Sequence, residues 1–238
     1  MCHKKLMMCG LVSAALWLHT AAADERITLG VKLLGAGWSG DNGGVNSSFN
    51  STEGGQLAFS ASYALEKFYA GISLQSGNYK FDGTAPDQFT PSARVSSSNV
   101  EIEQREMDLL AGYYFWDTVS LFVDIKGVSN TWSSSSYKQN FGGIGFGASG
   151  YMPINADWTG YGSVGFVGRG EIKDEDKVKV GDGSSGALEI GAVYRMAPNS
   201  TLNMGVKFRN YRLEYLTNST QDYSINALFV GYNHEFAF

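Results

Sequence analysis

The segment Tyr223–Phe238 reads YSINALFVGYNHEFAF, and along most of its length two kinds of side chain alternate. Leu228, Val230 and Tyr232 share one parity, which Phe236 continues. Alternation with a period of two residues is typical of a β-strand that has one apolar face. The segment therefore predicts a strand with an apolar environment on one face and a polar environment on the other.

Nine further segments upstream show the same pattern. In residues 119–126, VSLFVDIK, the apolar side chains of Leu121 and Val123 alternate with Ser120 and Asp124. Most of the segments have about 11 residues, the length of a tilted strand that crosses a bilayer. We therefore predict ten antiparallel strands, or eight if two of the weaker segments merge.

The connections between these segments alternate in length. Four are short turns: 66–67, 116–118, 153–157 and 197–200. Five are long polar links, predicted as loops: 39–54, 78–99, 130–140, 170–185 and 212–222. Short turns at one end and long loops at the other are expected of an up-and-down transmembrane barrel. The predicted fold class is therefore an all-β, antiparallel transmembrane β-barrel.

Charged side chains lie almost entirely on the small-or-polar parity. The opposite, apolar face is nearly free of charge. A soluble protein could bury that apolar face against a second sheet, whereas a barrel in lipid turns it outward and encloses the charges. Five basic and four acidic side chains nearly balance, which favours a salt-bridged lumen; the alternatives are the lining of a narrow pore, or acid–base chemistry by Glu106 and Asp108. The predicted lumen charge network is Lys32, Glu106, Asp108, Asp124, Lys126, Glu189, Arg195, Lys207 and Arg209.

Aromatic residues gather at both ends of the predicted strands. Such rings settle at the two interfaces of a membrane, so they predict two belts. The belt beside the short turns would hold Tyr63, Phe68, Tyr113, Tyr114, Phe115, Trp116, Tyr151, Trp158, Tyr194 and Tyr232. The belt beside the long loops would hold Trp38, Tyr79, Trp132, Tyr137, Phe141, Tyr211 and Tyr223.

The first 23 residues have the three parts of a secretory signal peptide. Lys4 and Lys5 precede a mostly apolar run, and Ala21–Ala23 offers small residues before the cleavage position. We predict that residues 1–23 are removed and that residues 24–238 form the barrel. Both cysteines lie in the removed part, so the mature chain would have no disulfide and no thiolate metal site.

Composition excludes some classes of function. The chain has 18 basic and 23 acidic residues, and this excess of negative charge argues against nucleic-acid binding. Residues 145–150, GFGASG, match a dinucleotide-binding spacing, but no helical pattern follows them. We interpret Gly143, Gly145 and Gly147 as positions that leave room for large side chains in a narrow lumen or let the strand bend. No cofactor and no metal site is predicted.

The ending Tyr232-Asn-His-Glu-Phe-Ala-Phe238 resembles the C-terminal strand of Gram-negative outer-membrane β-barrel proteins, the broad group of OmpA-like and small-porin-like barrels. The resemblance implies a location in the bacterial outer membrane, in contact with its lipid and lipopolysaccharide. It also implies an assembly signal, formed by Tyr232, Phe236 and Phe238, that the barrel-assembly machinery reads. His234 departs from the usual apolar residue of this pattern.

The resemblance to this class of barrels also implies which residues a catalytic site would need. Surface proteases of the omptin type use an Asp–His pair with two further carboxylates near the outer rim, and the lipid A deacylases and acyltransferases use a His with a Ser. Residues 24–238 contain one histidine, His234, with no Ser or Asp within two residues. We therefore predict a non-enzymatic protein with an envelope-structural or surface-interaction role through its long external loops. A narrow channel for small or hydrophobic solutes is the alternative, and a lipid or peptide hydrolase is a third hypothesis.

Overall fold

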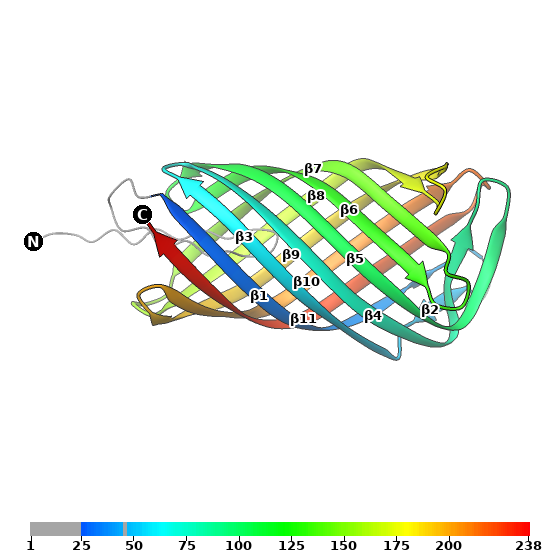
Figure 1. Ribbon diagram of the computed structural model, residues 1–238, viewed down its shortest axis with the longest axis horizontal. Coiled ribbons are helices and arrows are strands. Elements are labelled where there is room, and N and C mark those ends of the chain that lie inside the picture. The colour runs from blue at the N-terminus through cyan, green and yellow to red at the C-terminus, as the bar shows by residue number, and fades with distance from the viewer. Residues whose placement is uncertain (1–24, 45–46) are drawn as a thin grey trace, which may run out of the picture.

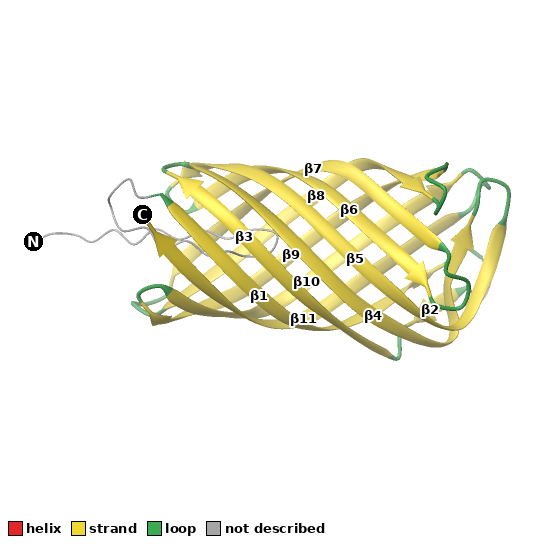
Figure 2. Cartoon of the chain, viewed as in Figure 1, coloured by secondary structure: helices red, strands yellow, loops and turns green. Residues whose placement is uncertain are grey.

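The computed structural model describes residues 25–44 and 47–238, so the predicted signal peptide lies outside the described residues. The described part of the chain contains no helix that is long and apolar enough to cross a membrane. It consists of strands joined by turns and loops (Figure 2). The strands are β1 (Arg26–Asp41), β2 (Ser48–Asn50), β3 (Glu53–Leu65), β4 (Phe68–Phe89), β5 (Arg94–Trp116), β6 (Val119–Trp132), β7 (Lys138–Pro153), β8 (Trp158–Lys173), β9 (Lys179–Ala197), β10 (Ser200–Tyr215) and β11 (Thr220–Ala237).

Ten of these strands form a closed antiparallel barrel (Figure 1). Each long strand pairs with the next in the chain, and β11 pairs with β1 over the full length from Arg26↔Ala237 to Asp41↔Asp222. The short β2 pairs with the end of β1. The prediction of a ten-stranded, up-and-down barrel is confirmed. Within the apolar band, closure leaves no strand edge with unpaired backbone groups; only the ends of β4 and β5 extend beyond their outer neighbours.

The apolar parity faces outward, as predicted. Leu29, Leu109, Val123 and Leu228 are exposed on the outer wall instead of converging in a packed centre. The predicted lumen charges lie on the inner side of the same strands, and most of them are buried. This arrangement places lipid-compatible side chains where a bilayer surrounds the barrel.

The polarity of the wall reverses at one height. On β4 the outer face changes from Phe68, Ile72 and Leu74 to Ser76, Asn78, Lys80 and Asp82, while the inner face changes from Ser73 and Gln75 to Tyr79 and Phe81. Strands β1, β5, β10 and β11 change in the same way. Above this level the barrel has the polar outside and apolar inside of a water-soluble protein. The level therefore marks the outer edge of the apolar band.

The reversal explains why the five long links are not loops. Most of their residues continue the strands: β4 extends to Phe89, and β5 begins at Arg94. Among the described residues, the true connections on this side are 42–44, 47 and 51–52 around β2, and 90–93, 133–137, 174–178 and 216–219. Polar residues and glycines on a strand surrounded by water resemble a loop in the sequence, because only the inner face stays apolar. The four short turns lie where they were predicted, within a residue at each end.

The predicted outer aromatic belt is wrong. All seven of its members point into the barrel and are buried, and Trp38 and Tyr79 are fully enclosed. In the belt beside the short turns, Tyr114 and Tyr151 are also buried. Trp158 is half-buried, and the exposed members are Tyr63, Phe68, Tyr113, Phe115, Trp116, Tyr194 and Tyr232. One interface therefore has a belt on the outer wall, whereas the rings at the other end form an interior core.

Glycines of β7 make room for larger side chains inside the barrel. A Cβ at Gly147 would lie 2.3 Å from the ring of Phe122, and a Cβ at Gly145 would lie 2.1 Å from Asp124 Oδ1. Both distances are shorter than any ordinary contact, so a larger residue at either position would displace its neighbour. The interpretation of these glycines as space for neighbouring side chains agrees with this packing.

Candidate functional site in the barrel interior

The largest group of buried charges surrounds Glu106 on β5. Lys126 Nζ lies 2.8 Å from Glu106 Oε1 and 2.5 Å from Asp108 Oδ1. Arg209 on β10 forms an ion pair with the second carboxylate oxygen of Glu106, and Lys207 Nζ lies 4.0 Å from the first. We call these five residues the Glu106 cluster. It joins β5 and β6 to β10 across the lumen.

Amide side chains extend this cluster to two more strands. Gln56 on β3 accepts hydrogen bonds from Arg209 (2.7 Å) and from Gln75, and Gln75 accepts one from Lys207 (3.2 Å). Gln104 accepts a hydrogen bond from Gln56 at 3.3 Å. The prediction named only charged residues and therefore missed these amides. They share the inward parity of the charges, which is the sequence signal that could have identified them.

A second group lies nearer the short turns. Lys32 Nζ is 2.7 Å from Glu189 Oε1, and the Tyr161 hydroxyl donates a hydrogen bond to the same oxygen at 2.9 Å. The Lys32 ammonium also lies 4.3 Å from the centre of the Phe229 ring. One carboxylate thus pairs with a lysine from β1 and a phenol from β8.

Two predicted members stand apart from both groups. Asp124 is buried, and among the described residues its Oδ1 has no hydrogen-bond partner. Arg195 is only partly buried, and its Nε likewise has no partner within that part of the chain. The structure therefore brings seven of the nine residues into two groups.

The two groups contain four cations, Lys32, Lys126, Lys207 and Arg209, and three carboxylates. Buried charges of this kind are tolerated only when they are paired and hydrogen-bonded. Glu106 alone accepts contacts from three cations, so no free base is presented to a substrate there. The geometry suits cross-lumen bracing better than acid–base chemistry.

An apolar core fills the lumen above the Glu106 cluster. Trp38 lies 5.2 Å from Tyr79 and 5.1 Å from Tyr223, and Tyr223 stacks on Tyr211 at 4.8 Å, all between ring centres. We call this group, with its buried neighbours, the aromatic plug. Its members are Trp38, Tyr79, Phe81, Ile102, Phe141, Tyr211, Leu213, Tyr223 and Ile225, all of which are buried.

The end of the β4–β5 hairpin, residues 83–97, covers the aromatic plug; we call it the cap hairpin. Gly83 has a φ of +121°, a conformation that favours glycine, and the pairing register shifts on either side of residues 84–85. Phe89 stacks on Tyr215 with ring centres 3.6 Å apart. Trp132 Nε1 donates a hydrogen bond to Pro86 O at 2.8 Å. These contacts fasten the cap hairpin to other strands of the rim.

A tyrosine and an asparagine complete the attachment of the cap hairpin. The hydroxyl of Tyr137 donates a hydrogen bond to the carbonyl of Phe89, and Asn42 Nδ2 donates one to Ala85 O at 2.8 Å. Burial raises the pKa of the Tyr137 phenol above its ordinary value, although the Phe89 hydrogen bond acts in the opposite direction. Tyr137 therefore stays a hydrogen-bond donor at any physiological pH.

The C-terminal strand presents Tyr232, Phe236 and Phe238 on the outer wall. Between them, His234 pairs with Ser200 across β10 and β11, with Nδ1 3.0 Å from Ser200 Oγ. The Tyr232 hydroxyl lies 3.0 Å from the same Oγ. The two residues are 34 positions apart, so the sequence around His234 does not predict this contact. Contact between a serine and a histidine is the start of a nucleophilic site, which also needs a group that orients the histidine.

The described residues contain no group of three or more His, Cys, Asp or Glu side chains placed to hold a metal ion.

Comparisons with known proteins agree with the fold. No family model matches the sequence, and no curated protein matches it. Among solved structures, the chain is similar to the outer membrane protease OmpT from Escherichia coli, with a TM-score of 0.59 and 10% identity over 92% of this chain and 99% of that chain. It also matches the β domain of the Bordetella autotransporter BrkA (TM-score 0.44, 11% identity, 90% and 100% of the two chains). The likeness to OmpT shows that the chain has the fold of an outer-membrane β-barrel.

Proposed function

We propose that this protein is a non-enzymatic barrel of the bacterial outer membrane that holds a closed, rigid rim outside the lipid for contact with partners. The observation that carries the proposal is the reversal of wall polarity. Below that level the outer wall suits lipid, and above it the wall suits water while the interior is packed like a protein core. A structure of this kind anchors at one end and displays a surface at the other.

The arrangement of the rim supports a role in display. The cap hairpin and the aromatic plug fill the outer mouth, so partners would meet a continuous surface. Short connections join long strands there, and few residues lie outside the sheet. Such a rim keeps its shape, and a preformed surface loses little conformational entropy when it binds.

The location and orientation can be tested by cysteine labelling on intact cells. Val178, in the β8–β9 loop, is exposed at the rim, and Lys67 lies in the β3–β4 turn at the opposite end. The chain's own cysteines, Cys2 and Cys9, belong to the predicted signal peptide. We expect a membrane-impermeant maleimide to label V178C on whole cells and K67C only after lysis. Labelling of K67C on whole cells would contradict the proposed orientation. So would a V178C variant that is labelled only after lysis.

A channel for small or hydrophobic solutes is the alternative function. The aromatic plug argues against it, because Trp38, Tyr79 and Ile102 are fully buried in the outer half of the lumen. We therefore expect the purified barrel to show no discrete openings in a planar bilayer. Regular openings of one size, abolished by boiling the sample, would favour the channel.

A lipid hydrolase is favoured by one observation, the contact between Ser200 and His234. Against it, the structure shows Nδ1 engaged with Ser200 and Tyr232, and the histidine ring packs against Phe236. Among the described contacts of His234 there is no carboxylate or amide that would orient the ring. We therefore propose that the three polar side chains form part of the belt at the inner interface, where such groups are common.

The C-terminal strand carries the proposed signal for assembly into the membrane. We propose that Tyr232, Phe236 and Phe238 are read by the barrel-assembly machinery, and that lipid and lipopolysaccharide surround the apolar band. Their exposure on the outer wall supports this proposal, since the side chains are accessible before lipid covers them. The narrower resemblance to OmpA-like barrels stays a prediction.

A further inference from the structure

A hollow of about 500 Å³ lies in the outer wall of β3 to β7, at the level where the apolar band ends; we call it the Arg105 hollow. Two rows of outward-facing residues cross this part of the wall, and the antiparallel register places the members of each row side by side. The lower row is Phe59, Leu74, Met107 and Gly127, continued by Gly142 on β7. The upper row, nearer the rim, is Leu57, Ser76, Arg105, Ser129 and Asn140.

The lower row supplies an apolar bed. Phe59, Leu74 and Met107 are exposed on the outer wall, whereas Gly127 and Gly142 have no side chain, so the wall steps down beside Met107. A Cβ on Gly127 would have Met107 O, at 3.9 Å, as its nearest atom outside the chain neighbours, so the space above this glycine is open. A glycine within a strand often marks a place where another molecule comes close to the backbone. An acyl chain fits this step, with the side chain of Met107 along it.

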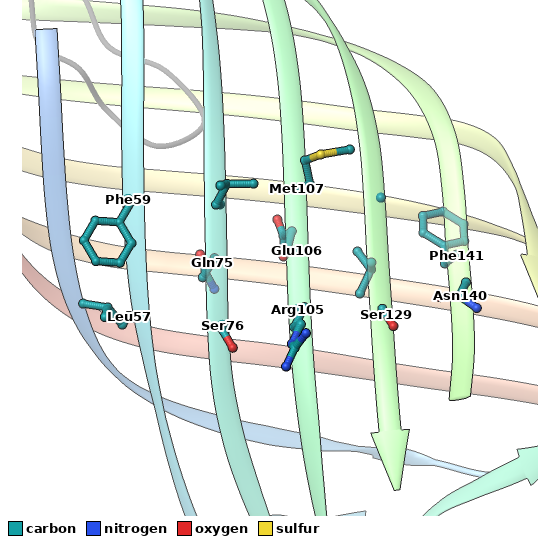
Figure 3. Close-up of a pocket in the computed structure, with 13 residues that line it drawn as sticks. Leu57, Phe59, Gln75, Ser76, Arg105, Glu106, Met107, Ser129, Asn140 and Phe141 are labelled. Atoms are coloured by element: carbon teal, nitrogen blue, oxygen red, sulfur yellow. The ribbon is translucent and has the colours of Figure 1, made fainter. Parts of the chain in front are cut away.

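The upper row supplies a cation flanked by hydroxyl groups (Figure 3). The side chain of Arg105 is 70% exposed, and its Nε contacts Glu103 Oε1 at 2.7 Å, which balances the charge of that carboxylate. A guanidinium has five N–H donors in a planar fork that matches a phosphate, so Arg105 has donors beyond this contact. Ser76 and Ser129 lie on either side of it, and a hydroxyl both donates and accepts hydrogen bonds. The row therefore matches a headgroup with a phosphate and several hydroxyls, such as a phosphorylated sugar.

Charge distinguishes the Arg105 hollow from a neighbouring one. A hollow of about 1060 Å³ extends from β11 across β1 to β4 and meets the Arg105 hollow at Leu57. The charged residues that border this larger hollow are both acidic, Glu53 and Glu103, so we call it the acidic hollow. Two charged residues border the Arg105 hollow, but the side chain of Glu106 is buried inside the barrel and only Arg105 faces outward. An anionic headgroup therefore fits the Arg105 hollow better than the acidic hollow.

We propose that the Arg105 hollow binds one phosphorylated glycolipid of the lipopolysaccharide type, with a phosphate on Arg105, sugar hydroxyls on Ser76 and Ser129, and an acyl chain over Gly127. The proposal rests on the proposed function, because the hollow meets the outer leaflet only if the band lies in the outer membrane with the rim outside. A phospholipid has the phosphate and the acyl chains but fewer hydroxyls, so it would use only part of the upper row. Lipopolysaccharide would then be held at one place on the wall, in addition to surrounding the band.

Native mass spectrometry of the folded full-length barrel tests the site. Lipid A, the phosphorylated glycolipid part of lipopolysaccharide, is offered separately from and in competition with phosphatidylglycerol and inorganic phosphate. A chelator is present, so that no divalent cation bridges a phosphate to Glu103. We expect the wild-type barrel to retain lipid A over phosphatidylglycerol. In Arg105→Ala the affinity for lipid A should fall about tenfold, because a charge-assisted contact with phosphate is lost.

Matched variants separate the Arg105 hollow from the rest of the wall. Gly127→Val fills the step beside Met107, and since valine suits a strand, the barrel should fold while its affinity for lipid A falls about tenfold. Gly35→Val is the control in the acidic hollow, where no atom lies within 4 Å of the place of the new Cβ, and it should leave retention unchanged. Arg169→Ala removes another exposed arginine, on β8, and should also leave retention unchanged.

Three results would overturn the proposal. Retention of lipid A by R105A equal to that of the wild-type barrel would remove the phosphate contact. Equal retention by G127V and the wild-type barrel, or equal losses in G127V and G35V, would remove the acyl bed from this hollow. A wild-type preference for phosphatidylglycerol, or displacement of lipid A by inorganic phosphate, would show that the occupant is not a glycolipid.

A separate readout distinguishes failure of the site from failure of the proposed function. A barrel that folds into lipid vesicles migrates differently on a gel before and after boiling. If no variant, and not the wild-type chain either, shows this shift, the membrane assignment itself is wrong. If all show it, the cysteine labelling places the rim outside, and only the retention of lipid A disagrees, then the Arg105 hollow is not a glycolipid site.

Discussion

Replacement of Glu106 by alanine is expected to destabilise the barrel by about 3–5 kcal/mol, the cost of removing one partner from a buried ion pair. The carboxylate contacts Lys126, Lys207 and Arg209, all of them buried. Without it, only Asp108 remains to balance three cations. The measurement is equilibrium unfolding in urea of barrels folded into lipid vesicles, followed by circular dichroism and by the gel shift on boiling.

Glu103 provides the matched control on the same strand. It faces outward and pairs with the exposed Arg105 at 2.7 Å. Exposed ion pairs contribute about 0–1 kcal/mol, so Glu103→Ala should change the free energy of unfolding by no more than that. A variant E106A as stable as E103A would show that the cluster is solvated and that the lumen is open to water at this height.

Replacement of Trp38 by alanine is expected to cost a similar amount, about 3–5 kcal/mol, because a large buried side chain leaves a cavity. Trp38 has no exposed surface, and it packs against Tyr79, Phe81 and Tyr223. The rings that contact it are held by two strands, β4 and β11, of the closed sheet, so they cannot all move inward to fill the space. Unfolding in urea, followed by circular dichroism to avoid the lost indole fluorescence, measures the effect.

Phe59→Ala is the control for Trp38. Phe59 is exposed on the outer wall within the apolar band, where lipid chains can occupy the space that the ring leaves. We therefore expect a clearly smaller loss of stability than in W38A. Equal losses would place Trp38 at the lipid interface, as the sequence alone suggested, and would remove the aromatic plug from the structure.

Alternation predicted the strands, and the short turns, the signal-peptide pattern and the C-terminal strand favoured a membrane barrel over a soluble sandwich. Each strand within the apolar band shows a period of two residues because lipid on one side and a polar lumen on the other impose opposite requirements. The halves of the strands above the apolar band were predicted as loops instead. There, residues such as Ser76, Asn78 and Lys80 face water, and a polar strand surrounded by water has the same composition as a loop.

Placement of the aromatic residues failed for a related reason. Trp38 and Tyr223 lie near the ends of the predicted strands, where membrane barrels usually have rings on the outer wall. Parity shows the error: Trp38 shares the inward parity of Lys32, and Tyr223 that of Asn233. The polarity of each face changes along a strand where its surroundings change from lipid to water. The parity of a residue, which decides whether its side chain points inward or outward, changes only at a bulge.

Seven of the nine predicted lumen charges join the network, but their pairing was not predictable from the sequence. Inward parity identified its charged residues, but the pairing depends on which strands face one another across the lumen. Lys32 and Glu189 are 157 residues apart and meet only after β11 closes on β1. The contact between Ser200 and His234 was missed for the same reason, because antiparallel register brings them together.

The height at which the wall changes polarity also sets the bilayer thickness that this barrel matches. The apolar outer residues run from Leu57 to Leu65 on β3 and from Met107 to Phe115 on β5, which at about 3.3 Å per residue is about 26 Å of strand before tilt shortens it. A typical hydrocarbon core is about 30 Å thick, and the bacterial outer membrane is thinner than average. Hydrophobic mismatch costs a fraction of a kcal/mol per ångström, so a thick membrane would have to thin around this barrel. The protein would accumulate in the thinner of two membranes offered to it without any receptor to direct it.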